Sequence, residues 1–130
     1  MKKWTFCTGI LRPAVCSRSP SPFKARGLWQ FIQPTALNYG LQITDQIDER
    51  LDPEKETDAA LSYFKDLMAQ FGDWRLAIKG YNEGEKRVQS LIERYHTRDP
   101  WELERISSTE SYLSGVMAMM LILKNPTLLD

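Results

Sequence analysis

The sequence predicts an all-α fold, an irregular helical domain rather than a symmetric bundle. Apolar residues recur at spacings of three and four along several segments. Proline, aspartate and glycine stand where helices typically begin and end. No segment alternates polar and apolar residues as a half-buried strand does, and no internal repeat is visible. The 130 residues are enough for one domain with a small core.

The first predicted helices lie in the first half of the chain. Pro34 suits the first turn of a short helix that runs to Tyr39 and ends at Gly40. Residues 41–51 are predicted to form an acidic loop. Asp52 and Pro53 then begin a long helix, as its cap and its first residue. The predicted apolar face of that helix consists of Ala60, Leu61, Phe64, Leu67, Met68 and Phe71.

Four further helices are predicted in the second half. Gly72 ends the long helix, and Asp73 caps a helix from residue 74 to about residue 80. The next helix has its apolar positions between residues 88 and 95, and a short helix covers residues 101–106. The last helix, residues 109–123, is apolar on nearly every side, so we predict that it is the buried central helix.

Composition and charge exclude several classes of function. Seventeen basic and seventeen acidic residues balance, so no nucleic-acid partner is expected. The sequence has no glycine-rich loop for a nucleotide and implies no cofactor. A single histidine, His96, and two cysteines, Cys7 and Cys16, offer no zinc set, and the acids of residues 45–56 lack the calcium-loop spacing, so we expect no metal. The apolar stretch at residues 116–123 is too short to span a membrane.

The amino-terminal segment differs from the rest of the chain. Residues 1–26 hold six Lys or Arg and no acid, and the first acidic side chain is Asp45. Prolines and the absence of a helical or strand period predict irregular structure for residues 1–20. The chain starts with Met1, Lys2 and Lys3, but the apolar run that follows is interrupted, so we expect no export signal.

Two short motifs combine glycine, aromatic and amide side chains, the Gly-Leu-Trp-Gln-Phe motif at residues 27–31 and the Gly-Tyr-Asn-Glu-Gly motif at residues 80–84. An aromatic face beside an amide suits a ligand rich in hydroxyl groups, such as a sugar. An alternative is that the tyrosines are partly buried and bond the backbone through their hydroxyls. The residues that could line such a groove are Trp29, Gln30, Tyr39, Tyr81, Asn82 and Tyr112.

These motifs belong to four ordered blocks that resemble the lytic transglycosylase domain of the soluble lytic transglycosylase (SLT) superfamily, of the membrane-bound murein transglycosylase D type. The blocks are residues 27–41, 48–53, 71–88 and 109–116. The resemblance implies a lysozyme-like α-helical domain over residues 21–130, with residues 1–20 outside it and the first helix of the fold incomplete. By resemblance, Gln30 and Tyr81 would contact sugar or orient the acid, and Tyr112 would lie in the same cleft. The residues that we predict to bind substrate are Trp29, Gln30, Tyr81, Asn82 and Tyr112.

The resemblance further implies an activity, the cleavage of peptidoglycan glycan strands between N-acetylmuramic acid and N-acetylglucosamine. One Glu first protonates the glycosidic oxygen and then acts as base on the C6 hydroxyl, which leaves a 1,6-anhydro end. The partner would be peptidoglycan, and the location the periplasm or cell envelope of a bacterium. A carboxyl with both roles needs a raised pKa, which burial against apolar groups provides, as for the acid of lysozyme.

The catalytic Glu of the family has no counterpart in this sequence. Its position falls near Arg12, and a guanidinium cannot donate a proton at ordinary pH. Glu83 and Glu110 are the candidate substitutes. We therefore expect impaired cleavage; the alternatives are a catalytically dead peptidoglycan-binding module and a helical interaction domain. The lack of acids and helical pattern in residues 1–20 suggests a truncated or frameshifted gene start, which the upstream DNA would test: no frame encoding Glu-Ser-x-Phe would refute it.

Overall fold

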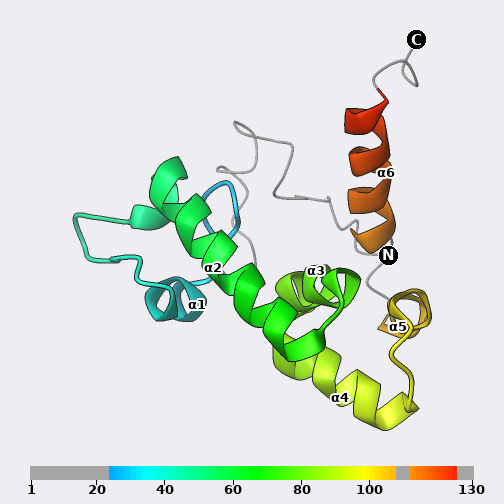
Figure 1. The fold of residues 1–130 in the computed structure, drawn as a ribbon. Helices are drawn as coiled ribbons and strands as arrows, with labels where there is room; N and C mark the ends of the chain where they lie inside the picture. Colours follow the sequence, from blue (N-terminus) through cyan, green and yellow to red (C-terminus); the bar gives the residue numbers. More distant parts are fainter. Residues whose placement is uncertain (1–23, 108–111, 126–130) are drawn as a thin grey trace, which may run out of the picture. The chain divides into compact units, whose positions relative to one another are not determined.

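The computed structural model describes residues 24–107 and 112–125, and there the protein is all-α, as predicted (Figure 1). The predicted irregular segment, residues 1–20, lies outside the described residues. Two isolated β-bridges and no strand occur in the described ranges. The chain divides into two compact units, Met1–Tyr63 and Phe64–Asp130. The elements are α1 (Gln33–Asn38), the 3₁₀ turn η2 (Glu49–Leu51), α2 (Pro53–Phe71), α3 (Trp74–Glu83), α4 (Glu85–Tyr95), α5 (Pro100–Ser107) and α6 (Tyr112–Lys124).

In the first unit, individual residues before α2 determine where α1 ends and where η2 begins. Pro34 lies in the first turn of α1, and Gly40 follows the helix with a φ of +84°, a conformation that favours glycine. The region predicted as a loop contains η2, which Asp48 caps by accepting the backbone N–H of Arg50 at 3.2 Å. An antiparallel bridge joins Ile43 and Asp48. The acidic loop is therefore more ordered than its composition predicts.

The long helix α2 begins where the sequence predicts. The Oδ1 atom of Asp52 accepts the backbone N–H groups of Glu54 at 3.1 Å and Lys55 at 3.2 Å, which satisfies two donors that a helix start leaves open. The buried stripe differs from the predicted one, because Leu61 and Met68 are 51% and 40% exposed. The helical period fits two overlapping stripes of residues on α2. The buried one contains the small residues Ala59 and Ala60, and not the predicted Leu61 and Met68. The buried positions are Glu56, Ala59, Ala60, Tyr63, Leu67 and Phe71.

Helix α3 extends further than predicted. Asp73 caps it by accepting the backbone N–H of Arg75 at 2.8 Å, but the helix ends at Gly84 and not near Gly80. Gly80 is an interior residue whose missing side chain leaves room for α2: a Cβ there would lie 2.9 Å from Phe71 Cε2. The sequence predicts that Gly80 ends the helix, whereas in the structure this glycine allows α3 to pack closely against Phe71. The second motif consequently occupies the last turn of α3 and its C-cap, Gly84.

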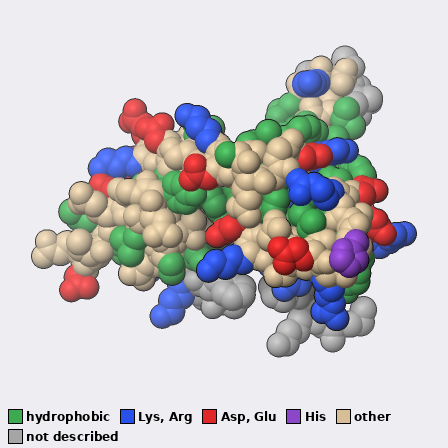
Figure 2. Space-filling model, turned by 60° about the horizontal axis from the view of Figure 1, so that its bottom comes forward, with side chains coloured by type: hydrophobic (Ala, Val, Ile, Leu, Met, Phe, Trp, Pro, Cys, Tyr) green, Lys and Arg blue, Asp and Glu red, His purple; other side chains and the backbone are tan. Residues whose placement is uncertain are grey.

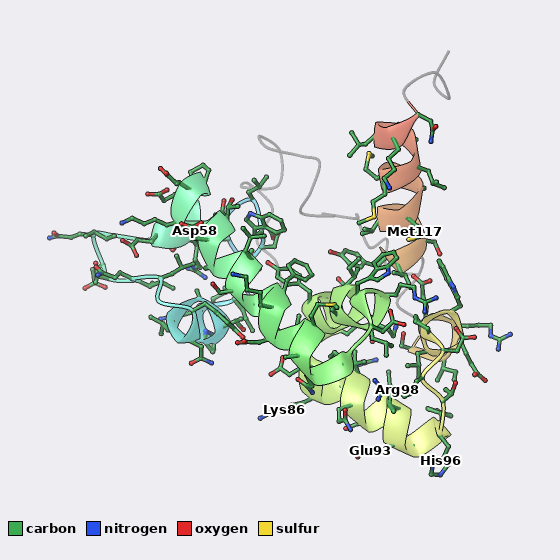
Figure 3. The ribbon with its side chains drawn as sticks, viewed as in Figure 1. Asp58, Lys86, Glu93, His96, Arg98 and Met117 are labelled. Atoms are coloured by element: carbon green, nitrogen blue, oxygen red, sulfur yellow. The ribbon has the colours of Figure 1, made fainter. Side chains whose placement is uncertain are left out.

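Helices α4 and α5 match their predicted positions to within a few residues. His96 follows α4 in a left-handed conformation, with φ +52°, and Pro100 is the first residue of α5. His96 is exposed, as Figure 2 shows, and its ring points away from the helices beside it in Figure 3. Lys86 and Glu93 on α4 also face solvent (Figure 3). This histidine therefore ends a helix and is not among the residues that line the crevice of the described second unit.

The last helix, α6, corrects the prediction of a buried central helix. Only Leu113 and Val116 are buried among its residues, and both lie in its first two turns. They pack with Ile78 of α3. The later turns expose large apolar side chains, among them Leu121 at 55% and Leu123 at 69%. An apolar composition shows that a helix can be buried on any side, but burial also needs neighbours at every turn.

Candidate functional site

The first motif forms a tight turn at residues 27–30. Arg26 and Phe31 flank it as an antiparallel bridge, with N···O distances of 3.1 and 3.0 Å. Inside the turn, the side-chain Nε2 of Gln30 donates to the Gly27 carbonyl at 2.7 Å. Gln30 has a φ of +54°, which is uncommon for a residue with a side chain. Phe31 is 2% exposed and anchors the end of the turn in the core, so the base of the 27–30 turn is held by both the bridge and this side chain.

A buried carboxylate holds the backbone of this turn. Glu56, in the first turns of α2, is 1% exposed; its Oε1 accepts the Leu28 N–H at 2.9 Å and its Oε2 accepts the Trp29 N–H at 3.1 Å. Burial raises the pKa of Glu56, and the two backbone N–H groups oppose that rise. Gly27 leaves the room for this approach, since a Cβ at this position would lie 2.2 Å from Glu56 Oε2 and 1.8 Å from the Arg50 carbonyl oxygen.

Helix α2 also holds the side chain of Trp29. The indole Nε1 donates to Thr57 Oγ1 at 2.9 Å, and the Thr57 hydroxyl donates to the Pro53 carbonyl at 2.6 Å. Trp29 remains half-buried. The N–H of the indole is therefore bonded within the protein, and the face of the ring is the part of the side chain that a ligand could contact.

Arg50 supports the turn from its flanks. The side chain is buried, and its Nη1 donates to the carbonyls of Lys24 at 3.1 Å and Phe31 at 3.3 Å. Its Nε and Nη2 bond the two carboxylate oxygens of Asp48 at 2.8 and 2.7 Å. This bidentate pair holds the pKa of Asp48 below its usual value. Arg50 thus bonds carbonyls next to the turn while Glu56 bonds N–H groups within it.

The second motif lies in the second unit, on the last turn of α3. The Tyr81 ring stacks on Phe64 of α2, with centroids 4.5 Å apart and planes 7° from parallel. Tyr81 is half-buried and Asn82 is exposed. Tyr112 packs on the same small core of Ile78, Leu113 and Val116 as Phe64 does. Burial raises the pKa of the Tyr112 phenol, so this side chain stays a neutral donor.

Glu83, which directly follows Asn82, belongs to a buried polar cluster. The Lys79 ammonium donates to Glu83 Oε1 and, at 2.8 Å, to Ser107 Oγ, and Ser107 Oγ donates to Glu83 Oε1 at 3.1 Å. Arg87 Nε lies 3.4 Å from Glu83 Oε2. The side chains of Lys79 and Glu83 are 3% and 2% exposed, so Glu83 is an ion-pair partner in the interior of the second unit.

A crevice next to this cluster is too tight to admit a water molecule. Asn82, Glu83 and Tyr112 line it together with Lys79, Glu104 and Leu113. Glu104 caps the start of α6, since its Oε1 accepts the backbone N–H of Leu113 at 2.8 Å. A sugar cannot reach Glu83 through this crevice.

Comparison with known proteins supplies the identity of the domain. A family model described as the transglycosylase SLT domain matches residues 11–104. The chain belongs to this family. The matched range begins inside the segment that we placed outside the domain, and the boundary at residue 20 stays a prediction.

Similar curated proteins agree with this family. Proteins named membrane-bound lytic murein transglycosylase D, from Escherichia coli K12 and Escherichia coli O6:H1, are each 37% identical over 121 residues, covering 89% of this chain and 27% of the relative. A putative tributyltin chloride resistance protein of Alteromonas sp. (strain M-1) is 41% identical over 69 residues, covering 52% of this chain and 33% of the relative. The chain spans about a quarter of the length of the Escherichia coli relatives.

The predicted site residues of this SLT domain fall into separate groups. Trp29 and Gln30 share the 27–30 turn of the first unit. Asn82 and Tyr112 line one crevice of the second unit, and Tyr81 stacks beside them on Phe64. Tyr39, in the first unit, packs its ring 4.9 Å from that of Tyr63. The remaining two, Arg12 and Glu110, lie outside the described residues.

The sequence pointed to neither Glu56 nor Lys79. Glu56 looked like an ordinary acid in the first turn of a helix, where it favours the helix dipole. A usable signal existed: continuing the buried stripe of Ala60, Tyr63 and Leu67 one turn backwards arrives at Glu56. Lys79 lies four residues before Glu83, the spacing of a helical ion pair. The signals therefore differ: a charged residue on an apolar stripe indicates Glu56, and the ion-pair spacing indicates Lys79.

The described ranges contain neither a cluster of metal ligands nor a helix that could span a membrane. No three His, Cys, Asp or Glu side chains gather there to hold an ion. None of the helices of that part of the chain combines the length and the apolar character needed to cross a bilayer.

Proposed function

We propose that this SLT domain binds the glycan strands of peptidoglycan and is a lytic transglycosylase whose cleavage reaction is impaired. The observation that carries the proposal is the family match over residues 11–104. The proposed substrate places the protein in the periplasm or cell envelope. The proposed product is a strand with a 1,6-anhydro end, formed between N-acetylmuramic acid and N-acetylglucosamine.

The side chains at the two motifs support glycan binding. Trp29 offers an aromatic ring held by α2, and Gln30 offers a side-chain carbonyl beside it while its amide N–H bonds the turn. Tyr81 offers a second ring, and Asn82 is an exposed amide next to it. Aromatic faces and amides together match the apolar faces and hydroxyl edges of sugar rings.

The position of the carboxylates supports impairment. Residues 1–44 hold no acid, although the family places its general acid in that part of the domain. Glu83 is an unsuitable substitute, because its side chain is 2% exposed and bonded to Lys79 and Ser107. Loss of general acid–base catalysis typically lowers a rate by about a hundred- to ten-thousandfold.

Digestion of purified peptidoglycan sacculi tests the proposal. We expect the chain to co-sediment with sacculi and to release 1,6-anhydro-muropeptides, detected by mass spectrometry, at least about a hundredfold more slowly than an active SLT domain. Failure to co-sediment would refute the proposed function. Release at the rate of an active domain would refute impairment, and Glu83→Gln and Glu110→Gln would then show whether either residue is the acid.

The burial of Glu83 also favours a second candidate, a binding module without catalysis. Such a module would co-sediment with sacculi equally well but would release no anhydro-muropeptide at any protein concentration. The yield of anhydro ends over a long incubation therefore separates a slow enzyme from a dead one.

A further inference from the structure

Glu56 is a buried carboxylate that lies beneath residues proposed to contact sugar. Both of its oxygens accept backbone N–H groups of the 27–30 turn, at 2.9 Å from Leu28 and 3.1 Å from Trp29. Carboxylate bonds to backbone N–H groups are stronger than those between neutral groups. The next residue, Thr57, bonds the indole of Trp29 at 2.9 Å. Two consecutive residues of α2 therefore fix the backbone and the side chain of one tryptophan.

We propose that Glu56 is a positioning residue that, together with Thr57, fixes Trp29 and the 27–30 turn for glycan binding. This inference rests on the proposed function. Glu56 acts through Trp29 and does not touch the ligand, because it is 1% exposed and lies under the turn. The same burial separates it from a role as proton donor, which would have to reach a glycosidic oxygen.

The geometry of Gly27 supports this role. The turn lies so close to α2 that a Cβ on Gly27 would overlap Glu56 Oε2 at 2.2 Å. This close packing of the turn against Glu56 is what we expect if Glu56 holds the turn in one position. Arg50 adds support on the other side by bonding the carbonyls of Lys24 and Phe31. Opposite charges thus bind opposite backbone groups, N–H by Glu56 and C=O by Arg50.

This pair of contacts from Glu56 and Thr57, the Trp29 clamp, also determines what Trp29 can present to a glycan. Its indole N–H is donated to Thr57, so recognition by Trp29 has to use the ring face. Hydrogen bonding to hydroxyl groups then falls to Gln30, whose Nε2 already bonds Gly27 and whose side-chain carbonyl can accept. We therefore expect stacking from one residue of the turn and a polar contact from its neighbour.

Amide hydrogen exchange followed by NMR on the full chain tests the Trp29 clamp without any ligand. In Glu56→Ala, the Leu28 and Trp29 amides should exchange about tenfold faster, since each loses its acceptor. In Glu56→Gln, a single carbonyl oxygen remains, so we expect one of the two amides to be released. Thr57→Val should shift the indole N–H signal of Trp29, assigned with Trp29→Phe. Glu54→Gln, an exposed acid in the same helix start, is the matched control.

If Glu56 only stabilised the fold, Glu56→Ala would speed amide exchange across the whole domain. Selective loss at Leu28 and Trp29, with core amides such as Val88 unchanged, supports positioning. Unchanged protection of both amides in Glu56→Ala would overturn the inference. If this variant fails to fold, Thr57→Val gives the answer alone: an unmoved indole signal would overturn the inference.

A binding measurement connects the Trp29 clamp to the glycan. Titration of peptide-free strands of alternating N-acetylglucosamine and N-acetylmuramic acid should show binding about tenfold weaker to Glu56→Gln than to the wild-type chain. Equal affinities would overturn the positioning role. If the wild-type chain binds no strand at all, the proposed function fails, and the exchange data still decide whether Glu56 holds Trp29.

Discussion

Replacement of Gly27 by alanine tests the close approach between the 27–30 turn and α2. The new methyl group would lie 1.8 Å from the Arg50 carbonyl oxygen and 2.2 Å from Glu56 Oε2. Carbon and oxygen atoms normally stay at least about 3.3 Å apart. The turn therefore has to move by roughly an ångström or more, which breaks its bonds to Glu56.

The cost follows from these contacts. Two hydrogen bonds to a carboxylate contribute ~1.5 kcal/mol each at the low end. Alanine at a φ of +82° adds ~1 kcal/mol, because its Cβ meets the backbone in this region. We expect Gly27→Ala to lower the free energy of unfolding by roughly 4 kcal/mol in all.

Gly40→Ala is the matched control. Gly40 has nearly the same φ, +84°, but no atom lies within 4 Å of a Cβ built there. This variant should cost only the conformational part, ~1 kcal/mol. Urea unfolding followed by circular dichroism measures both variants. Equal losses of stability would refute the reasoning, because the close approach to Glu56 and Arg50 would then have no energetic weight.

Two further predictions concern buried charges. Lys79→Met leaves Arg87 as a cationic partner of the buried Glu83 and should cost up to ~3 kcal/mol, while adding Glu83→Leu should recover most of that in urea unfolding; no recovery would contradict the pairing. The raised pKa of Glu56 means that the folded state keeps this proton to a higher pH than the unfolded chain, so stability should fall as pH rises from 4.5 through the raised pKa. Glu56→Gln should lack this fall between about pH 4 and 7, and an unchanged slope would contradict it.

Local signals predicted most of the fold. Asp52 and Asp73 cap the helices that they were expected to cap, because capping depends on a side chain and the N–H groups two or three residues away. The end of α3 was predicted wrongly, because the role of Gly80 depends on Phe71, which packs against it from another helix. The prediction that α6 is buried was wrong for the same reason, since the hydrophobicity of a helix does not reveal which neighbours it has.

The sequence predicts the candidate sugar-contacting side chains, and their role stays a prediction, but it does not predict the residues that hold them in place. Trp29 and Gln30 were identified from residue types that suit a sugar. Glu56 was not identified. The helical stripe can indicate that it is buried, but its partners, Leu28 and Trp29, lie 28 and 27 residues away along the chain and depend on the fold. Side chains that meet a ligand can be recognised by their chemistry, whereas the residues that hold them in place depend on the fold.

Three acids that lie near predicted site residues in the described part of the chain each bond another group of the protein. Glu56 bonds the turn below Trp29, Glu83 pairs with Lys79, and Glu104 caps α6 beside Tyr112. A general acid has to be able to reach the glycosidic oxygen, and because each of these carboxylates is bonded within the protein, we propose that none of them is the acid. Outside the described residues the sequence offers two acids, at positions 110 and 130. The proposed glycan binding can therefore be tested apart from the proposed impairment of cleavage, because Trp29 is held by Glu56 and Thr57, neither of which is proposed as the general acid.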